Sequence, residues 1–353
     1  MSDSKKFYMP GEWSEHENCW MAWPPEQRRD IYPNLDDMRR QYADVASAIA
    51  EFEPVMLLAT TETADDARRH CSGKVEVIEQ ELDDAWLRDI GPTFVLTESN
   101  QLGGVDWQFN CWGDPESAHQ TDATIARVIN ELTGATNLPA SIFLEGGAIH
   151  CNGDGLLLTT KNVVLNHNRN PGLTRLDAEC LFKDYLGVEK VVWLDHALEY
   201  DDTDGHVDNL ACFSDSGVAL VLSASDSEDS NYARLRRNID TLSNVTTASG
   251  DRLDLIEIQQ PARQEYRGEP LPLSYINFYI ANGGIVLPEF NDPMDQPALE
   301  AVTAAFPDRE IVQLPAIEIT KGGGCIHCIT QQQPKSVPRL SVNTRLEGRV
   351  DGG

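Results

Sequence analysis

The sequence predicts a single α/β domain in which a β-hairpin followed by a helix recurs around a common centre. Short apolar runs meet Gly-containing turns, continue into second apolar runs and then give way to helix-like segments. Glycine pairs or triplets mark these units at 103–104, 146–147, 283–284 and 322–324, and no linker or low-complexity tract divides residues 1–353. Repeated units that bury one face against their neighbours favour a closed ring with active-site loops at its axis.

The first elements along the chain have clear periodicity. A helix is expected over 35–52, because its apolar residues fall at helical spacing at Met38, Tyr42, Val45, Ala46 and Ile49. A strand over 55–59 follows. The clearest hairpin joins 141–151 to 156–160 through the turn sequence Asn152-Gly153.

Two further units repeat this order. In the first, a strand over 206–213 turns at 214–217 into a strand over 218–222, and a helix over 231–245 follows. In the second, a strand over 275–280 turns at 281–284 into a strand over 285–288, with a helix over 297–306. A doubly wound nucleotide-binding sheet is the competing α/β interpretation. The absence of a strand-linked G-x-G-x-x-G or P-loop sequence weakens it.

The composition predicts a globular, cytoplasmic protein. Hydrophobic residues make up 41% of the chain, no secretory h-region follows Met1, and no apolar run approaches the roughly 20 residues that span a bilayer. The net charge of −29 argues against nucleic acid and anionic membranes as partners and favours small cations, although solubility or salt tolerance also accounts for it. The eight cysteines are scattered, as expected of reduced, mostly buried thiols. Assembly into a homo-oligomer is left open.

Two acidic motifs carry candidate binding groups. The segment 83–92 places Asp89 close to Trp86, and a carboxylate beside an indole face suits a planar cation. Alternatively, Trp86 is a core residue and Arg88 pairs with Asp89. The segment 201–208 ends in His206-Val-Asp208, where residues two apart on a strand point to the same face and pair a proton carrier with a carboxylate. A solvated acidic turn would have the same composition.

The third motif follows a glycine triplet. Cys328 lies in the segment 321–334, where the backbone can approach a ligand closely and its N–H groups can favour a thiolate. Cys325 and Cys328 form one C-x-x-C, which alone is a weak signal for zinc or thiol redox chemistry. Together the three motifs supply a nucleophile, a general acid/base and several carboxylates. A guanidinium substrate needs these groups, because carboxylates hold its N–H groups while a thiolate attacks its central carbon.

These motifs resemble the agmatine deiminase branch of the guanidine-modifying superfamily, which is also grouped with the bacterial peptidyl-arginine deiminases. Five segments, spread in order over nearly the whole chain, carry the resemblance: 16–24, 86–92, 144–147, 202–208 and 322–334. The resemblance implies a five-bladed α/β propeller of the pentein type, with the whole of 1–353 as one catalytic domain. It implies no cofactor and no metal.

The resemblance also implies roles for individual residues. Cys328 would attack the guanidinium carbon of agmatine. His206 would protonate the departing ammonia and then activate water for hydrolysis of the thiouronium adduct, supported by Glu145. The substrate would be held by Asp89, Asp208, Trp86 and Asp202, with Asp202 near the distal amine. The product would be N-carbamoylputrescine, an intermediate of polyamine biosynthesis.

Three alternatives differ in substrate or in class. Free arginine requires a cationic clamp for its carboxylate, and the motifs contain no arginine cluster. Peptidyl arginine favours a secreted enzyme with an open cleft. A non-catalytic ring of the same fold would have little reason to gather Cys328, His206 and paired carboxylates.

Overall fold

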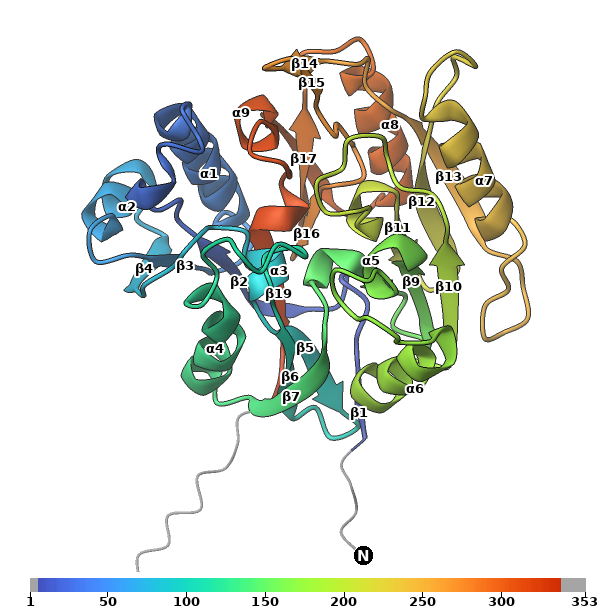
Figure 1. Ribbon diagram of the computed structural model, residues 1–353, viewed down its shortest axis with the longest axis horizontal. Helices are drawn as coiled ribbons and strands as arrows, with labels where there is room; N and C mark the ends of the chain where they lie inside the picture. Colours follow the sequence, from blue (N-terminus) through green and yellow to red (C-terminus); the bar gives the residue numbers. More distant parts are fainter. Residues whose placement is uncertain (1–5, 338–353) are drawn as a thin grey trace, which may run out of the picture.

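The fold, seen in a computed structural model that describes residues 6–337, contains five sheets of one shared connectivity (Figure 1). In each sheet an antiparallel strand pair is extended by a third strand, which runs parallel to the second and follows it through a helical crossover. Four of the sheets contain β5 (Thr93–Thr97), β6 (Leu102–Gln108) and β7 (Thr136–Phe143); β8 (Ile149–Cys151), β9 (Leu156–Thr160) and β10 (Lys190–Leu194); β11 (Ala211–Asp215), β12 (Val218–Ser223) and β13 (Asp254–Gln259); and β16 (Tyr279–Ala281), β17 (Gly284–Glu289) and β18 (Glu310–Pro315).

The fifth sheet joins the two ends of the described chain. Its antiparallel pair is β19 (Thr330–Pro334) with β2 (His16–Ala22), and β3 (Val55–Ala59) and β4 (Val75–Glu79) extend it in parallel. The short β1 (Phe7–Tyr8) adds an edge to β5, and β14 (Glu265–Tyr266) pairs only with β15 (Glu269–Pro270). The five sheets are separate, and in Figure 1 they lie around the middle of the molecule.

Helices make the crossovers within the sheets. They are α1 (Leu35–Ile49), α4 (Ile125–Thr133), α6 (Arg175–Leu186), α7 (Tyr232–Leu242) and α8 (Asp295–Ala305), while α2 (Ala64–His70) precedes β4. Local sequence sets their ends. For example, α6 begins with a capping box between Thr174 and Asp177 and ends at Gly187, whose φ of 67° lies in the left-handed region. Short helical turns complete the chain: α3 (Leu87–Ile90), α5 (Lys161–Val164), α9 (Ile317–Thr320), η1 (Glu26–Arg28), η2 (Asp122–Thr124), η3 (Gly146–Ala148), η4 (Val207–Asn209) and η5 (His327–Ile329).

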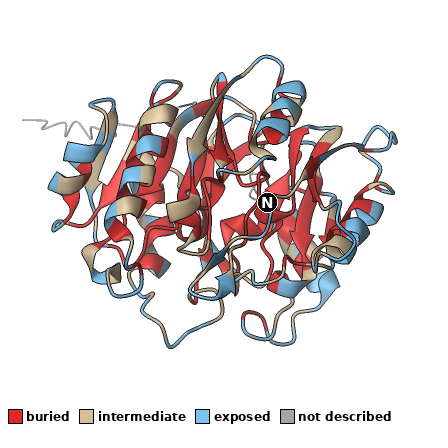
Figure 2. Ribbon diagram, turned by 90° about the horizontal axis from the view of Figure 1, so that it is seen from above, coloured by how far each residue is buried: buried red, intermediate tan, exposed pale blue. Residues whose placement is uncertain are grey.

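The core follows the strands. Figure 2 shows buried residues along the sheets and the inner faces of the helices, and exposed residues on the outer helix faces and loops. Most buried apolar side chains form one large cluster, and a second cluster packs around Trp107, Phe182 and Trp193 between the sheets of β5 and β8.

The structure corrects several predicted boundaries. The segment 206–213 is not a single strand, because the 3-10 turn η4 occupies its start and β11 begins only at Ala211. Likewise, β16 begins at Tyr279, and 141–143 belongs to β7 of the preceding sheet. Gly103 and Gly104 lie inside β6 instead of in a turn; a Cβ on Gly104 would meet Asn130 Oδ1 at 1.9 Å. The predicted helices all form, with α1 ending at Ile49.

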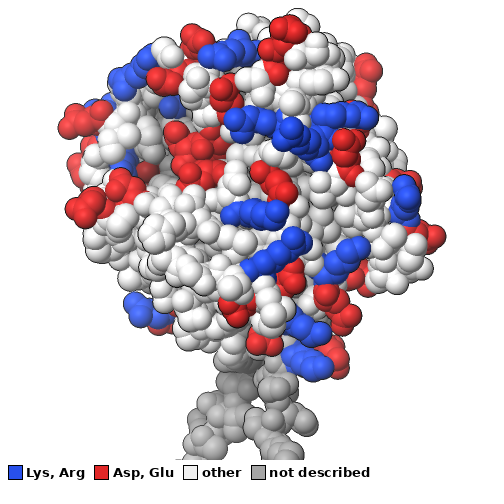
Figure 3. All heavy atoms as spheres, turned by 45° about the vertical axis from the view of Figure 1, so that its right-hand side comes forward, with Lys and Arg blue, Asp and Glu red and all other residues white. Residues whose placement is uncertain are grey.

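Charge is spread over the surface. On the face shown in Figure 3, acidic and basic side chains are interspersed. Within residues 6–337, no helix combines the length and the apolar character that crossing a membrane requires.

Candidate active site

Each of the five sheets is preceded by a turn that carries a polar side chain into the centre of the molecule. These turns hold Asp89 in α3, Glu145 before η3, Asp208 in η4, Asn277 before β16 and Cys328 in η5. All five side chains are buried. Because α3 lies against η3 and η5, and η3 against η4, residues far apart in the sequence meet at one point.

A cavity of about 170 Å³ opens over this point. Four of the predicted site residues line it, namely Cys328, Asp89, Trp86 and Asp202. The other three are 0–1% exposed: His206 lies 3.8 Å from Asp89, Asp208 lies 3.5 Å from Cys328, and Glu145 lies 3.5 Å from His206. The structure therefore brings together all seven predicted residues.

His206 lies between two carboxylates. Its Nδ1 is 3.8 Å from Asp89 Oδ1, and its Nε2 is 3.5 Å from Glu145 Oε2. Burial alone would lower the pKa of His206, but Asp89, Glu145 and Asp208 outweigh it and raise that pKa to about 9. The ring is therefore an imidazolium at neutral pH and can give a proton to a leaving group.

Glu145 is anchored on its far side by Arg169. The fully buried guanidinium donates to both carboxylate oxygens of Glu145 at 2.9 and 3.1 Å and pairs with Asp204 at 2.6 Å. Burial would raise the pKa of Glu145, but His206 and Arg169 reverse that effect and lower it. Glu145 therefore stays an anion that can stabilise the charged imidazole.

Asp89 receives a hydrogen bond on each oxygen. The backbone N–H of Gly147 donates to Oδ1 at 2.9 Å, and the indole N–H of Trp112 donates to Oδ2 at 2.9 Å. Gly147 must be glycine here, because a Cβ would lie 2.6 Å from His206 Nδ1 and 2.9 Å from Asp208 Oδ2. Burial raises the pKa of Asp89, and His206 opposes this.

The Cys328 thiol is held between Asp208 and Asn277. Its Sγ is 3.5 Å from Asp208 Oδ2 and 3.2 Å from Asn277 Nδ2. The expectation that this turn favours a thiolate is wrong for the free protein: burial, together with Asp208 and Asp89, raises the pKa of Cys328 well above its usual value. Carboxylates beside a buried sulfur disfavour a further negative charge on it.

The mouth of the cavity is aromatic and acidic. Trp86 donates its indole N–H to Tyr32 Oη at 3.1 Å, and Tyr32 in turn donates to Asp84 at 2.8 Å. A Cβ on Gly324 would lie 2.6 Å from the Trp86 ring, so the glycine triplet is needed for the close approach of η5. Asp202 also lines the cavity as a solvent-exposed residue, and partial desolvation of its carboxyl raises its pKa.

Several residues of the site escaped the sequence analysis. The sequence does not predict Trp112, Arg169, Asn277 or Tyr32. Asn277 could have been predicted, because it is a polar residue within the apolar run 275–280. No such signal marks Arg169. Arg88, considered as a partner of Asp89, instead pairs with Glu12 at 3.3 Å.

Neither thiol of the C-x-x-C belongs to a possible metal centre. In the described part of the chain, metal-ligating side chains form one group of three, Glu12, His150 and His327, which includes neither Cys325 nor Cys328. Cys325 is buried and free.

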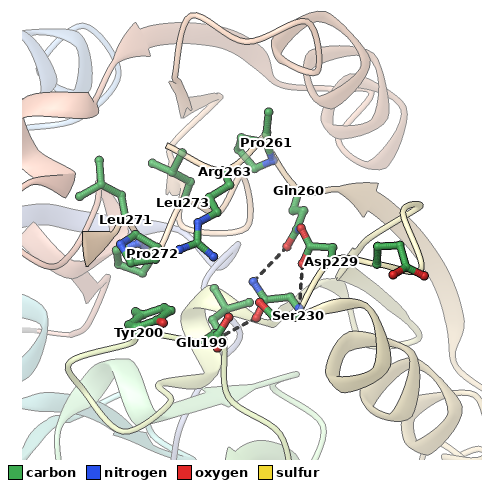
Figure 4. A pocket seen from close by; sticks show the side chains of 15 residues that line it. Glu199, Tyr200, Asp229, Ser230, Gln260, Pro261, Arg263, Leu271, Pro272 and Leu273 are labelled. Carbon is green, nitrogen blue, oxygen red and sulfur yellow. Dashed lines mark hydrogen bonds between the residues drawn. The ribbon is translucent and has the colours of Figure 1, made fainter. Parts of the chain in front are cut away.

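A second hollow, of about 240 Å³, lies between the loops around 199–200, 228–231 and 260–273 (Figure 4). Arg263 points into it and lies over the Tyr200 ring at 5.7 Å. The described residues that line it include no cysteine, whereas Cys328 lines the smaller cavity.

Solved structures identify the class of fold. An agmatine deiminase of Enterococcus faecalis matches with a TM-score of 0.87 at 32% identity, over 94% of this chain and 97% of that one. An agmatine deiminase of C. jejuni with substrate bound also has a TM-score of 0.87, at 26% identity and over 94% and 97% of the two chains. The fold is thus a mixed α/β fold of the pentein type found in these guanidine-modifying enzymes.

The sequence comparison identifies the family. Residues 8–334 match the Porphyromonas-type peptidyl-arginine deiminase family, and the chain belongs to this family. An agmatine deiminase of Pseudomonas aeruginosa is 41% identical over 356 aligned positions, which cover 93% of this chain and 95% of the relative.

Proposed function

We propose that this protein hydrolyses agmatine to N-carbamoylputrescine and ammonia through a covalent adduct on Cys328. The observation that carries this proposal is the convergence of one thiol, one protonated imidazole and two carboxylates at a small cavity: Cys328, His206, Asp89 and Asp208. The agmatine deiminases among its relatives support agmatine as the substrate.

The first half of the reaction uses the charges already in place. Asp89 and Asp208 bind the guanidinium nitrogens, and this cation lowers the pKa of Cys328, so the thiol proton is released on binding. The Cys328 sulfur then forms a bond to the guanidinium carbon. His206 gives its proton to one nitrogen, the C–N bond breaks, and ammonia departs. The adduct that remains on Cys328 is a thiouronium cation.

The second half regenerates the cysteine. His206, now neutral, takes a proton from water, and the hydroxide adds to the same carbon. The C–S bond then breaks, the hydroxyl proton goes to the sulfur, and the substituted urea leaves. Glu145 stabilises the imidazolium form of His206 in both halves, and its contact with Arg169 keeps it in place.

The repeated connectivity supports the finer description of the fold. We infer that the five sheets are the blades of one propeller, with 1–353 as a single catalytic domain, because each sheet has the same strand order and each delivers one turn to the site. The pairing of β19 with β2 would close this ring.

Agmatine fits the cavity better than arginine does. The described residues that line the cavity include Asp202 and Asp89 but no Lys or Arg, so an ammonium is favoured over a carboxylate. The test is ammonia release from agmatine, arginine and a blocked arginine peptide, with Asp202→Asn beside the wild type. We expect steep preference for agmatine and a raised agmatine KM in the variant. Equal kcat/KM on agmatine and arginine would overturn the assignment.

A further inference from the structure

The structure places a buried histidine directly behind the catalytic carboxylate Asp208. His327 Nδ1 lies 2.9 Å from Asp208 Oδ2, and its Nε2 lies 3.0 and 3.1 Å from the two oxygens of Glu12. All three side chains are at most 4% exposed. His327 thus bridges a carboxylate of the active site and a carboxylate outside it.

The hydrogen bonds determine how His327 is protonated. Ionised carboxylates only accept hydrogen bonds, so both ring nitrogens of His327 must donate, which requires the imidazolium form. The pKa directions agree with this form. Burial opposes both shifts, yet the pKa values of Glu12 and Asp208 are lowered. Burial and the charge of Arg88 oppose the shift of His327, yet the two carboxylates raise its pKa. Further charged or titratable neighbours are Arg88 and His150, 3.3 and 3.5 Å from Glu12, and the Cys328 thiol, 3.5 Å from Asp208. His206 also acts on Asp208 through its charge.

The hydrogen bonds around Glu12, His150 and His327 also argue against a metal ion at these three residues. His150 Nδ1 accepts the backbone N–H of Phe213 at 3.4 Å, so Nε2 carries the ring proton and faces Glu12. A metal ligand would need the lone pair of that Nε2. With Arg88 also on Glu12, this carboxylate is surrounded by donors.

The two carboxylate oxygens of Asp208 differ in their hydrogen bonding. Oδ2 is engaged by His327 and by the Cys328 thiol, whereas Oδ1 is buried and has no hydrogen-bond partner among the described residues. An unpaired buried carboxylate oxygen is costly unless a ligand supplies a donor. His327 is itself fixed, because its backbone N–H and that of Cys328 both donate to Asn277 Oδ1.

We propose that His327, held as a cation by Glu12, is a positioning residue that keeps Asp208 ionised and turned so that Oδ1 meets the guanidinium of the substrate. The identity of the substrate in this proposal rests on the proposed function. The protonation of His327 is inferred from its hydrogen bonds alone. His327 touches neither the substrate nor the reacting carbon and acts through Asp208.

The kinetic test compares His327→Ala, His327→Asn and Glu12→Gln with the wild type. His327→Ala should reduce kcat/KM for agmatine by roughly 10- to 100-fold, as expected for the loss of one hydrogen bond to a charged group. In the plot of kcat/KM against pH, the acidic limb of this variant should move to higher pH, because Asp208 loses the cation that lowers its pKa. His327→Asn, whose amide can still donate to Asp208, should recover part of kcat/KM. Glu12→Gln should move the acidic limb the same way.

A matched control separates this role from a structural one. Glu53→Gln removes the carboxylate of another buried pair, His16 with Glu53 at 3.1 Å, away from the cavity. It should lower the melting temperature without moving the acidic limb. If the His327 and Glu12 variants also change only the melting temperature, or if Glu53→Gln moves the limb equally, the proposal is wrong.

A second measurement does not depend on agmatine turnover. Nitrogen NMR of protein labelled at histidine, with the His327 signals assigned by their loss in His327→Asn, should show both ring nitrogens protonated at neutral pH. A neutral ring, or stoichiometric bound zinc that Glu12→Gln releases, would overturn the proposal. If the wild type fails to release ammonia from agmatine, the proposed function fails, and the NMR result still decides the state of His327.

Discussion

In the free site, the thiol that we propose as the nucleophile is protonated, and the imidazole that we propose as the general acid is charged. Cys328 faces Asp208 and Asp89, so its pKa is raised, while the same carboxylates with Glu145 raise the pKa of His206 to about 9. A guanidinium cation between these groups favours the thiolate, and the same positive charge lowers the pKa of His206 from its value in the free site. We therefore expect activation of Cys328 to be coupled to binding of a cationic substrate, which would limit its reaction with other electrophiles.

Removal of the sulfur should stop the chemistry and leave the binding groups in place. Cys328→Ala should abolish ammonia release while agmatine still binds, as measured by calorimetry, because Asp89 and Asp208 remain. Cys325→Ala, which removes the other buried thiol of the same motif, is the matched control and should stay active. A Cys328→Ala enzyme with more than about one hundredth of wild-type turnover would show that Cys328 is not the nucleophile.

The raised pKa of His206 predicts an alkaline limit to activity. The imidazolium is lost as pH rises through about 9, so kcat/KM for agmatine should fall there. Glu145→Gln should move this limb to lower pH, because one of the anions that raise the pKa of His206 becomes neutral. A limb that stays in place in Glu145→Gln would exclude this electrostatic role for Glu145.

The same group links pH to stability. The folded-state pKa of His206, about 9, lies above the ordinary value of 6.5, so its contribution to the free energy of unfolding is fully present below about 6.5. That contribution is lost as pH rises through the folded-state pKa. The direction is opposite to that of a carboxylate with a lowered pKa.

At the scale of elements, the turns before the sheets account for the site. Each turn is short, is helical or irregular, and lies outside the hydrogen-bonded strands of the sheet that follows it. Each carries one polar side chain that is buried at the site. Glycines make the close contacts between turns feasible, above all Gly147 beside His206 and Gly324 beside Trp86.

A methyl group at position 147 should therefore be enough to disable the site. Gly147→Ala should lose activity and about 1–3 kcal/mol of unfolding free energy, the usual cost of overpacking. Gly217→Ala is the control, since its Cβ would meet nothing within 4 Å. Activity assays and denaturant melts of both variants make the comparison. If Gly147→Ala is as active as Gly217→Ala, the packing of η3 against η4 is looser than the structure indicates.

The sequence was most informative about elements with strong periodicity. Apolar spacing predicted α1, and Asn152-Gly153 predicted the hairpin of β8 and β9, because both patterns act over a few residues. The turn η4 was mistaken for a strand because three residues have no period to read. Contacts such as Arg169 with Glu145, or Glu12 with His327, depend on tertiary packing, and local sequence does not encode them.

At the scale of the whole molecule, the fold is held together where the two ends of its described part pair. Residues 330–334 of β19 pair with 16–21 of β2, and Cys328 stands directly before this strand. The thiol proposed as the nucleophile is thus positioned by a long-range pairing whose loop closure spans most of the chain.

The net charge of −29 acts at the same scale and predicts a salt effect on substrate capture. Agmatine carries two positive charges, so the field of the protein attracts it over distances comparable with the Debye length, about 10 Å at 0.1 M salt. Raising sodium chloride from about 10 mM to about 500 mM should lower kcat/KM for agmatine, mainly through KM, and should affect arginine, with its single net charge, less.

Stability must be followed in the same series, because an acidic surface can also be stabilised by salt, which screens its self-repulsion. Melting temperature at each salt concentration separates the two effects: steering predicts a falling kcat/KM while the melting temperature stays level or rises. A kcat/KM for agmatine that is independent of salt, or that falls no more than the value for arginine, would show that the negative charge serves solubility or salt tolerance and does not attract the substrate.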